Sequence, residues 1–286
     1  MHQAVQALVG PTIADQASSY TFERHLLSSV DGQRKYQIDM AIPSQASPPG
    51  GFAVLYMLDG NAAMDTLTQA DLTEMARKHP PVLVAIGYDE DTRHDANARA
   101  YDYTPPYPAS AGRTDAPVVR GRAGGGAEVF FELIQNRIKP LVATRASVNA
   151  QQEYLWGHSY GGLFTLYTFL THPDAFSRYI AGDPSGWWND GVLAQFWKAF
   201  DIARATDRQV TILLASRPGD TRRAGAASCA RPESTTPADP CGTTRLMVDT
   251  LNRSGHDATF EAVQHASHGD MLPISLKRAM QLATTP

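Results

Sequence analysis

The sequence is poor in several features that would indicate particular classes of protein. Only two cysteines occur among its 286 residues, and the net charge is −4. No apolar run approaches the ~20 residues that a membrane-spanning helix needs, so we expect no membrane span. The small negative charge gives no reason to expect a nucleic-acid partner.

Lysine is also scarce. Of the 25 basic residues, 20 are arginine and 5 are lysine. Codon usage in a GC-rich genome produces such a bias, and so does recognition of anionic groups by the planar, always-charged guanidinium. Composition alone leaves both explanations open.

The remaining composition is that of a folded globular protein. Hydrophobic residues make up 43% of the chain and charged residues 19%, which argues against wholesale disorder. The length is compatible with one large α/β domain, although it would also allow two. We predict a single domain over residues 1–286, in which residues 1–19 are a flexible N-terminal segment or the remnant of a leader.

The two cysteines enclose an irregular segment. Cys229 and Cys241 flank "ARPESTTPADP", and a disulfide between them would close this loop in an oxidising compartment. This pattern favours the periplasm. Free thiols and a cytoplasmic location are the alternative, because "MHQAVQALVGPTIADQ" lacks the basic start of a signal peptide.

Hydrophobic periodicity gives the order of elements. Two alternating segments, 20–30 and 35–43, surround the turn pair Asp31-Gly32 and predict an antiparallel hairpin. Pro140 is expected to end a helix over 128–139. The further strands are predicted at 51–60, 80–89, 153–157, 177–183, 209–216 and 258–265. The further helices are predicted at 62–79, 161–172, 191–200, 244–255 and 273–283.

This order predicts an α/β fold with a mostly parallel central sheet, an antiparallel N-terminal hairpin and helices on both faces. Two long segments, 90–126 and 217–242, are rich in glycine, proline and arginine and have no such periodicity. Long loops of this kind in an α/β domain are usually functional or disordered.

The stretch "EYLWGHSYGGLFT" contains the pattern G-x-S-x-G between a predicted strand and a predicted helix. A serine at such a sharp turn is an exposed nucleophile, and Gly157 and Gly161 leave room where strand and helix approach. A glycine-rich packing corner is the alternative, but it does not explain the hydroxyl at the apex. We therefore predict Ser159 as the nucleophile, with the N–H of Tyr160 directed at a developing oxyanion.

The base is expected late in the chain. His268 in "HASHGDMLP" follows the last predicted strand, where the order Ser, acid, His of α/β-hydrolases would place it. His265 is the competitor, but it falls at the strand end, where a structural role is expected.

The acid has several candidates. We favour Asp220, the first carboxylate after the strand at 209–216, and Glu233 and Asp239 follow it in the same loop. Asp183, at the end of the previous strand in "AGDPSGWW", is an alternative. A third possibility is that no acid takes part and a backbone carbonyl orients His268.

A second oxyanion donor is expected after the strand at 51–60. In "LDGNA", Asn61 follows Gly60 at the start of a predicted helix, where a backbone N–H is free to donate. Asn61 is therefore the predicted second donor.

With these residues in place, the chain resembles the trilactone-siderophore esterases, the α/β-hydrolases that open enterobactin-type catecholate macrolactones. The resemblance runs from residue 20 onward, and its local motifs are "YMLDGNAAMD", "RAYDYTPP", "GRAGGGAEVFFELIQNRIKP", "WGHSYGGLF" and "HGDMLP". It implies the α/β-hydrolase fold, Ser159 and His268 as nucleophile and base, and Asn61 and Tyr160 as donors to the oxyanion. It also implies that Arg122 contacts the substrate anion and that Arg99 matches an arginine ahead of "DYTP".

A ferric catecholate siderophore is anionic and aromatic, and the segment 99–122 suits it. Its arginines, Arg99, Arg113, Arg120 and Arg122, are interleaved with tyrosines that offer stacking faces. Trp187 and Trp188 follow a strand and offer a further wall. Two departures from the family stand out, namely Asp183 before "PS" and the cysteine-bounded segment, and some members of the family work with a Ser-His dyad.

The predicted function is a serine esterase that hydrolyses the ester bonds of a ferric catecholate siderophore trilactone and helps to release iron. It needs no cofactor or metal of its own, since iron arrives with the substrate. A generic carboxylesterase or thioesterase is the first alternative. A non-catalytic ferric-siderophore binding protein is the second.

Overall fold

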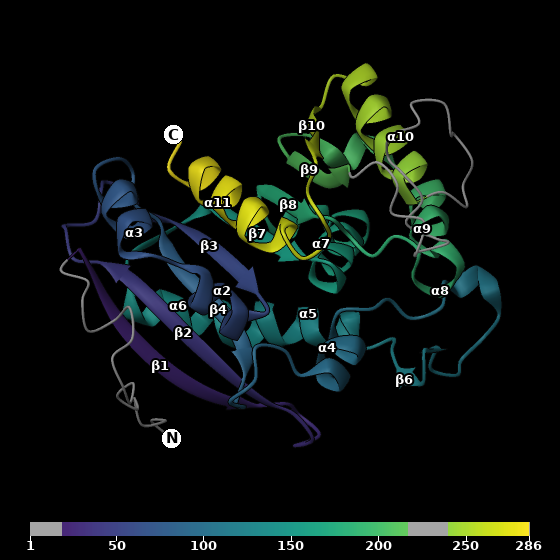
Figure 1. Cartoon of the computed structure of the whole chain (residues 1–286), viewed down its shortest axis with the longest axis horizontal. Helices are drawn as coiled ribbons and strands as arrows, with labels where there is room; N and C mark the ends of the chain where they lie inside the picture. Colours follow the sequence, from purple (N-terminus) through teal and green to yellow (C-terminus); the bar gives the residue numbers. More distant parts are fainter. Residues whose placement is uncertain (1–18, 217–239, 286) are drawn as a thin grey trace.

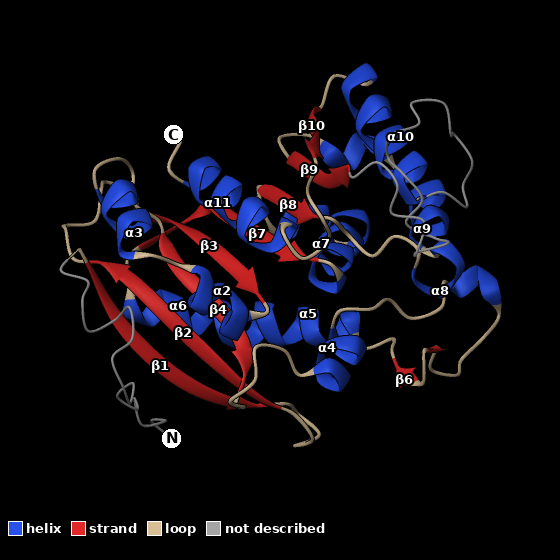
Figure 2. Ribbon diagram, viewed as in Figure 1, coloured by secondary structure: helices blue, strands red, loops and turns tan. Residues whose placement is uncertain are grey.

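The computed structural model describes residues 19–216 and 240–285, and its central feature is an eight-stranded sheet (Figures 1 and 2). The strand order is β1-β2-β4-β3-β7-β8-β9-β10. The β1–β2 and β2–β4 pairs are antiparallel and the others are parallel. The strands are β1 (Tyr20–Ser28), β2 (Lys35–Pro43), β3 (Phe52–Leu58), β4 (Val82–Tyr88), β7 (Val148–His158), β8 (Arg178–Gly182), β9 (Gln209–Ser216) and β10 (Asp257–Gln264). The predicted α/β fold with an antiparallel start is confirmed.

Helices cover both faces of this sheet and enclose a core on each side (Figure 2). One face is covered by α2 (Gly60–Thr66), α3 (Gln69–Ala76) and α11 (Met271–Ala283). The other is covered by α5 (Ala127–Leu133), α6 (Lys139–Arg145), α7 (Tyr160–Thr171), α9 (Leu193–Ala199) and α10 (Pro240–Arg253). Successive residues of β3, such as Tyr56 and Met57, enter opposite cores, as the two-residue period of a strand requires.

The helix predicted over 62–79 is in fact two helices, α2 and α3. The break comes at Thr68, whose Oγ1 accepts the N–H of Asp71 at 3.2 Å. The Asp71 carboxylate accepts the N–H of Thr68 in return, at 3.0 Å. This reciprocal capping box starts a new helix and ends the old one.

The helix predicted to end at Pro140 continues to Arg145. A π-helical turn, Ile134–Ile138, lies between α5 and α6. Pro140 therefore falls in the first turn of α6, directly after the π-helical turn. The prediction was wrong because the change of helix type before Pro140 lets the chain continue as a helix beyond it.

The long segment 90–126 is partly ordered into α4 (Ala96–Asp102), a 3₁₀ turn Ala109–Ala111 and a two-stranded hairpin, β5 (Val118–Val119) and β6 (Arg122–Ala123). Short helices also occur at Pro173–Ala175, Trp188–Gly191 (α8) and Ile202–Ala205. In Figure 1, α4 and β6 lie on the side toward which the parallel strands point. This segment therefore lies near the carboxyl ends of the strands.

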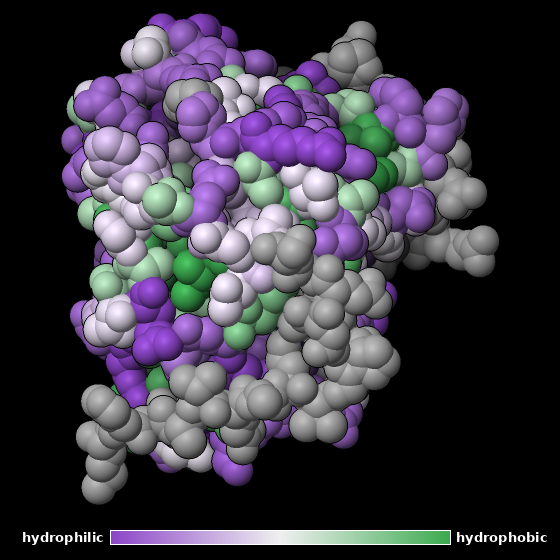
Figure 3. Space-filling view, turned by 90° about the vertical axis from the view of Figure 1, so that its left-hand side faces the viewer, coloured by the Kyte–Doolittle hydropathy of each residue, from purple (hydrophilic) through white to green (hydrophobic). Residues whose placement is uncertain are grey.

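Several predictions concern residues that the structure does not describe. Residues 1–18 and 217–239 lie outside the described ranges, so the N-terminal segment, the single-domain assignment and the disulfide of Cys229 remain predictions. Within the described ranges, no helix is both long enough and apolar enough to cross a membrane. Figure 3 shows a face on which hydrophilic side chains predominate and hydrophobic ones form small groups.

Candidate active site

The turn from β7 to α7 presents Ser159 in a strained conformation. Ser159 is the N-cap of α7, with φ 60° and ψ −115°, a backbone region that side chains other than glycine rarely adopt. A Cβ on Gly157 would come within 2.3 Å of the Gly161 backbone. Strand and helix therefore approach too closely for any larger residue, and the serine is held at the apex.

His268 approaches this serine from the loop between β10 and α11. Its Nε2 lies 3.0 Å from Ser159 Oγ, which is hydrogen-bonding distance. The loop is held by Asp270, whose carboxylate accepts the N–H of Ser267 at 2.8 Å. His265, the competing histidine, lies exposed at the end of β10. The geometry therefore joins Ser159 to His268, as a nucleophile and base must be.

Asp183, at the carboxyl end of β8, holds the other nitrogen of His268. His268 Nδ1 lies 2.5 Å from Asp183 Oδ2. The second carboxylate oxygen accepts the N–H of Ala215 at 3.1 Å, so the side chain is tied to β9. Asp220 lies outside the described residues. The structure thus brings Asp183, the alternative acid, within hydrogen-bonding distance of His268, and the preference for Asp220 stays a prediction.

His158 contacts the backbone carbonyl and the ring of His268, a role that the sequence pattern did not indicate. Its Nε2 lies 2.9 Å from the carbonyl oxygen of His268, and the two ring centroids are 4.7 Å apart. Burial, together with the neighbouring His268, lowers the pKa of His158 to about 4. His158 is therefore neutral near pH 7 and its Nε2–H donates to the carbonyl.

This low pKa makes the folded protein sensitive to acid. The unfolded chain protonates His158 near pH 6.5, whereas the folded protein resists until about pH 4. The contribution of His158 to the free energy of unfolding is therefore complete above pH 6.5. It falls by up to about 3 kcal/mol on acidification to pH 4. The free energy of unfolding can be measured in urea at pH 7.5 and at pH 4.5. Between these two values, we expect it to fall by about 2–3 kcal/mol less in His158→Gln than in wild type. An equal loss in both proteins would contradict this explanation.

The two predicted oxyanion donors both stand at helix starts. Tyr160 is the first residue of α7 and Asn61 the second residue of α2, where backbone N–H groups have no acceptor within the helix. The Asn61 side chain is bound elsewhere, since its Nδ2 donates to the carbonyls of Tyr88 and Glu90 at 3.0 and 2.9 Å. Asn61 therefore has its backbone N–H, rather than its amide, to offer an oxyanion.

These two helix starts lie side by side. A Cβ on Gly161 would be 3.3 Å from Leu58 Cβ and 3.7 Å from Asp59 Oδ2. The first turn of α7 thus packs on the turn from β3 to α2. The helix start that carries Asn61 therefore lies next to the turn that carries Ser159 and Tyr160.

Arg99, predicted to contact substrate, is engaged by a protein carboxylate. Its Nε and Nη2 lie 2.8 and 2.7 Å from the two oxygens of Asp59. Burial alone would raise the pKa of Asp59, but Arg99 and His94 hold that pKa well below its ordinary value. The Nε and Nη2 of Arg99 are therefore occupied by Asp59 rather than free to bind a substrate anion.

An aromatic and cationic surface extends from the nucleophile. The rings of Tyr160 and Trp187 have centroids 6.1 Å apart, and Arg120 Cζ lies 4.0 Å from the centroid of the Trp187 ring. Trp187 is half-buried, as a wall of the site would be. Arg122, the predicted anion contact, lies exposed in β6, opposite Val119 across the hairpin. The residue that reaches Trp187 is thus Arg120.

Glycines fasten this hairpin to the body of the protein. A Cβ on Gly124 would come 2.7 Å from the Trp188 ring, and a Cβ on Gly126 would come 2.2 Å from the Tyr101 ring. The N–H of Gly125 donates to Thr104 Oγ1 at 3.1 Å. The "GRAGGG" and "DYTPP" motifs are therefore one packed unit that positions the arginine turn.

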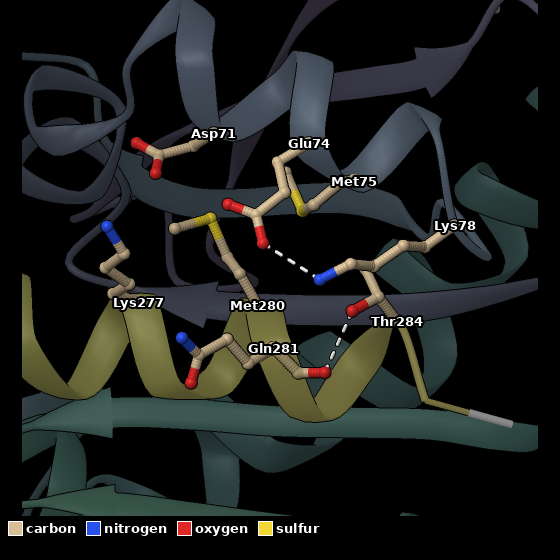
Figure 4. A pocket seen from close by; sticks show the side chains of 8 residues that line it. All are labelled: Asp71, Glu74, Met75, Lys78, Lys277, Met280, Gln281 and Thr284. Atoms are coloured by element: carbon tan, nitrogen blue, oxygen red, sulfur yellow. Dashed lines mark hydrogen bonds and ion pairs between the residues drawn. The ribbon is translucent and has the colours of Figure 1, made fainter.

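Two hollows elsewhere do not contain the chemistry. Figure 4 shows one between α3 and α11, where Glu74 and Lys78 form an ion pair at 2.8 Å. Its volume of about 20 Å³ accommodates little more than one water. The other, of about 660 Å³, lies at the amino ends of β7 to β10, whereas α/β sheets bind ligands at the carboxyl ends. Within 19–216 and 240–285, no group of three or more His, Cys, Asp or Glu could hold a metal ion.

Comparisons with known proteins show the family of this chain. The sequence matches the family model described as "Putative esterase" over residues 29–265. It is 35% identical over 274 residues to the apo-salmochelin esterase of Escherichia coli O6:H1, covering 95% of this chain and 82% of the relative. It is 31% identical over 271 residues to the ferri-bacillibactin esterase BesA of Bacillus subtilis, covering 92% and 90%.

The solved structure of enterobactin hydrolase IroE in complex with DFP is similar with a TM-score of 0.79 and 31% identity, over 96% of this chain and 99% of that chain. This likeness confirms the predicted α/β-hydrolase fold. Because the family model spans most of the sequence and two siderophore esterases are more than 30% identical over most of their length, this chain belongs to the esterase family, among the relatives of the siderophore esterases.

Proposed function

We propose that this esterase opens the ester bonds of a catecholate siderophore trilactone and so helps to release the iron. The substrate class depends on one observation, that Arg120 stacks on Trp187 next to the nucleophile elbow. The relatives support it, since their names specify salmochelin and bacillibactin as substrates. A generic carboxylesterase would have no need of a cation at this wall.

The reaction follows from the hydrogen bonds around Ser159. Its Oγ attacks the ester carbonyl carbon while its proton moves to Nε2 of His268. Asp183 accepts the Nδ1–H and stabilises the imidazolium. The N–H groups of Asn61 and Tyr160 donate to the oxyanion. As the ester C–O bond breaks, His268 returns the proton to the leaving alkoxide. Water then hydrolyses the acyl-serine with the same proton transfers.

Recognition of the substrate follows from the wall beside the elbow. Catecholate rings are flat and their oxygens carry negative charge, so one ring can stack on Trp187 while its oxygens pair with a guanidinium. Arg120 lies over Trp187 from the two-residue turn between β5 and β6, and Arg122 is the first residue after that turn. Iron enters as part of the substrate and needs no site of its own on the protein.

This recognition predicts a charge-selective effect at Arg120. Its φ is 53°, and asparagine tolerates that conformation where alanine does not. We expect Arg120→Asn to raise KM for a ferric tricatecholate trilactone about 10-fold, the loss of one stacked cation contact. Turnover of a neutral nitrophenyl ester should stay within about 2-fold. Steady-state kinetics on both substrates measure the difference.

Arg113 provides the matched control. It belongs to the same loop, but Asp115 lies 2.5 Å from its Nη2 and offsets its charge. We expect Arg113→Ala to behave as wild type and Arg122→Ala to weaken binding of the anionic substrate only. If Arg120→Asn and Arg122→Ala lost activity equally on the anionic and the neutral ester, the substrate assignment would be wrong.

Export to the periplasm is part of the proposal and depends on the two cysteines alone. Cys229 lies outside the described residues, so the predicted disulfide with Cys241 remains a prediction. A disulfide there would favour an oxidising compartment over the cytoplasm.

A further inference from the structure

The two oxyanion donors belong to separate elements, and the Arg99 side chain contacts a residue at the start of each element. Arg99, from α4, binds the Asp59 carboxylate with Nε and Nη2, at 2.8 and 2.7 Å. Asp59 immediately precedes the helix start that carries Asn61. The Arg99 Cζ also lies 5.2 Å from the centroid of the Tyr160 ring. A single guanidinium therefore contacts the residues that carry or adjoin both donors.

The turn at Asp59 needs such support. Asp59 has φ 50° and ψ 50°, a left-handed conformation that is uncommon outside glycine. Its side chain is only 2% exposed, and a buried carboxylate is costly unless a cation and hydrogen bonds compensate it. Its N–H donates to Tyr103 Oη at 3.0 Å. Arg99 and Tyr103 thus hold the left-handed turn that comes two residues before Asn61.

We infer that Arg99 is a positioning residue for the oxyanion hole, which fixes the start of α2 relative to the start of α7 through Asp59 and the Tyr160 ring. The inference depends on ester hydrolysis at Ser159 and not on the identity of the acyl group. It assigns Arg99 a function on every substrate, charged or neutral.

The chemistry of the guanidinium explains why arginine stands here. Its planar fork binds both carboxylate oxygens, and its flat face stacks on an aromatic ring, whereas a lysine ammonium is a point charge. Oxyanion donors act when they lie about 2.7–3.1 Å from the oxyanion. A displacement of about 1 Å costs on the order of 100-fold in rate. A small shift between the two helix starts would therefore lower kcat.

The test uses Arg99→Lys, with a neutral nitrophenyl ester as substrate and a neutral trifluoromethyl ketone as inhibitor. The adduct of this ketone with Ser159 carries an oxyanion, so its affinity reports on the oxyanion hole. We expect kcat to fall by about 10–100-fold with KM nearly unchanged. The affinity for the ketone should fall by the same factor. Arg113→Lys, in the same segment 90–126, should match wild type in both measurements.

A second pair of variants keeps the inference testable if Arg99→Lys does not fold. Tyr160 is half-buried, so its ring can be changed without opening the core. Tyr160→Leu keeps the backbone N–H but removes the stacking face, and it should lower kcat on the neutral ester by about 3–10-fold. Tyr160→Phe keeps the face, so its kcat on the neutral ester should exceed that of Tyr160→Leu by the same factor. Equal activity of these two variants would overturn the inference.

The substrate pattern separates this inference from the proposed function. If Arg99→Lys raised KM for the anionic trilactone and left the neutral ester and the ketone unaffected, Arg99 would be a substrate contact and the inference would fail. If the neutral ester and the ketone behaved as expected but wild type did not open the trilactone, the inference would stand and the proposed substrate would be wrong.

Discussion

Replacing Ser159 by alanine is expected to lower kcat on esters by about 10⁴–10⁶-fold, the range found when a catalytic serine is removed. Ser159 Oγ lies 3.0 Å from His268 Nε2, so removing it takes away the hydroxyl from which His268 would accept a proton. The residual rate would come from binding and the oxyanion donors. Ester hydrolysis followed to long times measures the loss.

Ser185 is the matched control for this variant. Its Oγ lies 3.3 Å from Ser159 Oγ, and it is buried in the segment between β8 and α8. Ser185→Ala removes a neighbouring hydroxyl but leaves the bond from Ser159 to His268 in place. We expect it to keep activity within about 10-fold, as loss of one neutral hydrogen bond would. If it were as damaging as Ser159→Ala, the assignment of the nucleophile would be wrong.

The second large effect is expected at Asp183. Its Oδ1 accepts the N–H of Ala215 and its Oδ2 binds His268 Nδ1. In Asp183→Asn, the amide oxygen would stay with Ala215 and the NH₂ group would face His268. Because two donors cannot share a bond, His268 would carry its proton on Nε2 and could not accept one from Ser159. We expect kcat to fall about 10³–10⁴-fold.

Asparagine is a fair test because it tolerates the backbone. The φ of Asp183 is 42°, a conformation in which asparagine and aspartate are enriched. A melting temperature near that of wild type would show that the loss is catalytic. Asp220→Asn serves as the comparison and is expected to keep full activity. If Asp220→Asn lost activity and Asp183→Asn kept it, the acid would lie after β9, as the usual order of α/β-hydrolases has it.

The nucleophile elbow is predictable from the sequence because its requirements are local. A buried strand, two small residues and a helix must follow one another around Ser159, and all of them lie within a few residues. The base was predictable for a similar reason, since His268 follows the last strand of the sheet. The antiparallel start and the buried strands followed equally from the alternation and runs of apolar residues.

The acid was not predictable in this way. Asp183 acts through a bond to a backbone N–H 32 residues later and another to His268, 85 residues later. Neither partner can be read from the neighbourhood of Asp183. One local signal was available, because an aspartate directly after a strand is among the few residues that accept a positive φ.

Arg99 shows the same limit. Its partner Asp59 lies 40 residues away, in a different βα unit. An arginine in a loop rich in arginine and tyrosine suggests a substrate contact, and only the tertiary structure brings it against the turn that carries Asn61. The split of the helix over 62–79, by contrast, had a local signal in the capping box of Thr68 and Asp71.

Mass spectrometry of the products formed from a ferric tricatecholate trilactone tests the central claim most directly. With wild type, we predict products that have gained one water for each ester bond opened, with ¹⁸O from labelled water in the new carboxylate. Ser159→Ala should leave the trilactone intact under the same conditions. An intact trilactone after incubation with wild type that still hydrolyses a nitrophenyl ester would contradict the account.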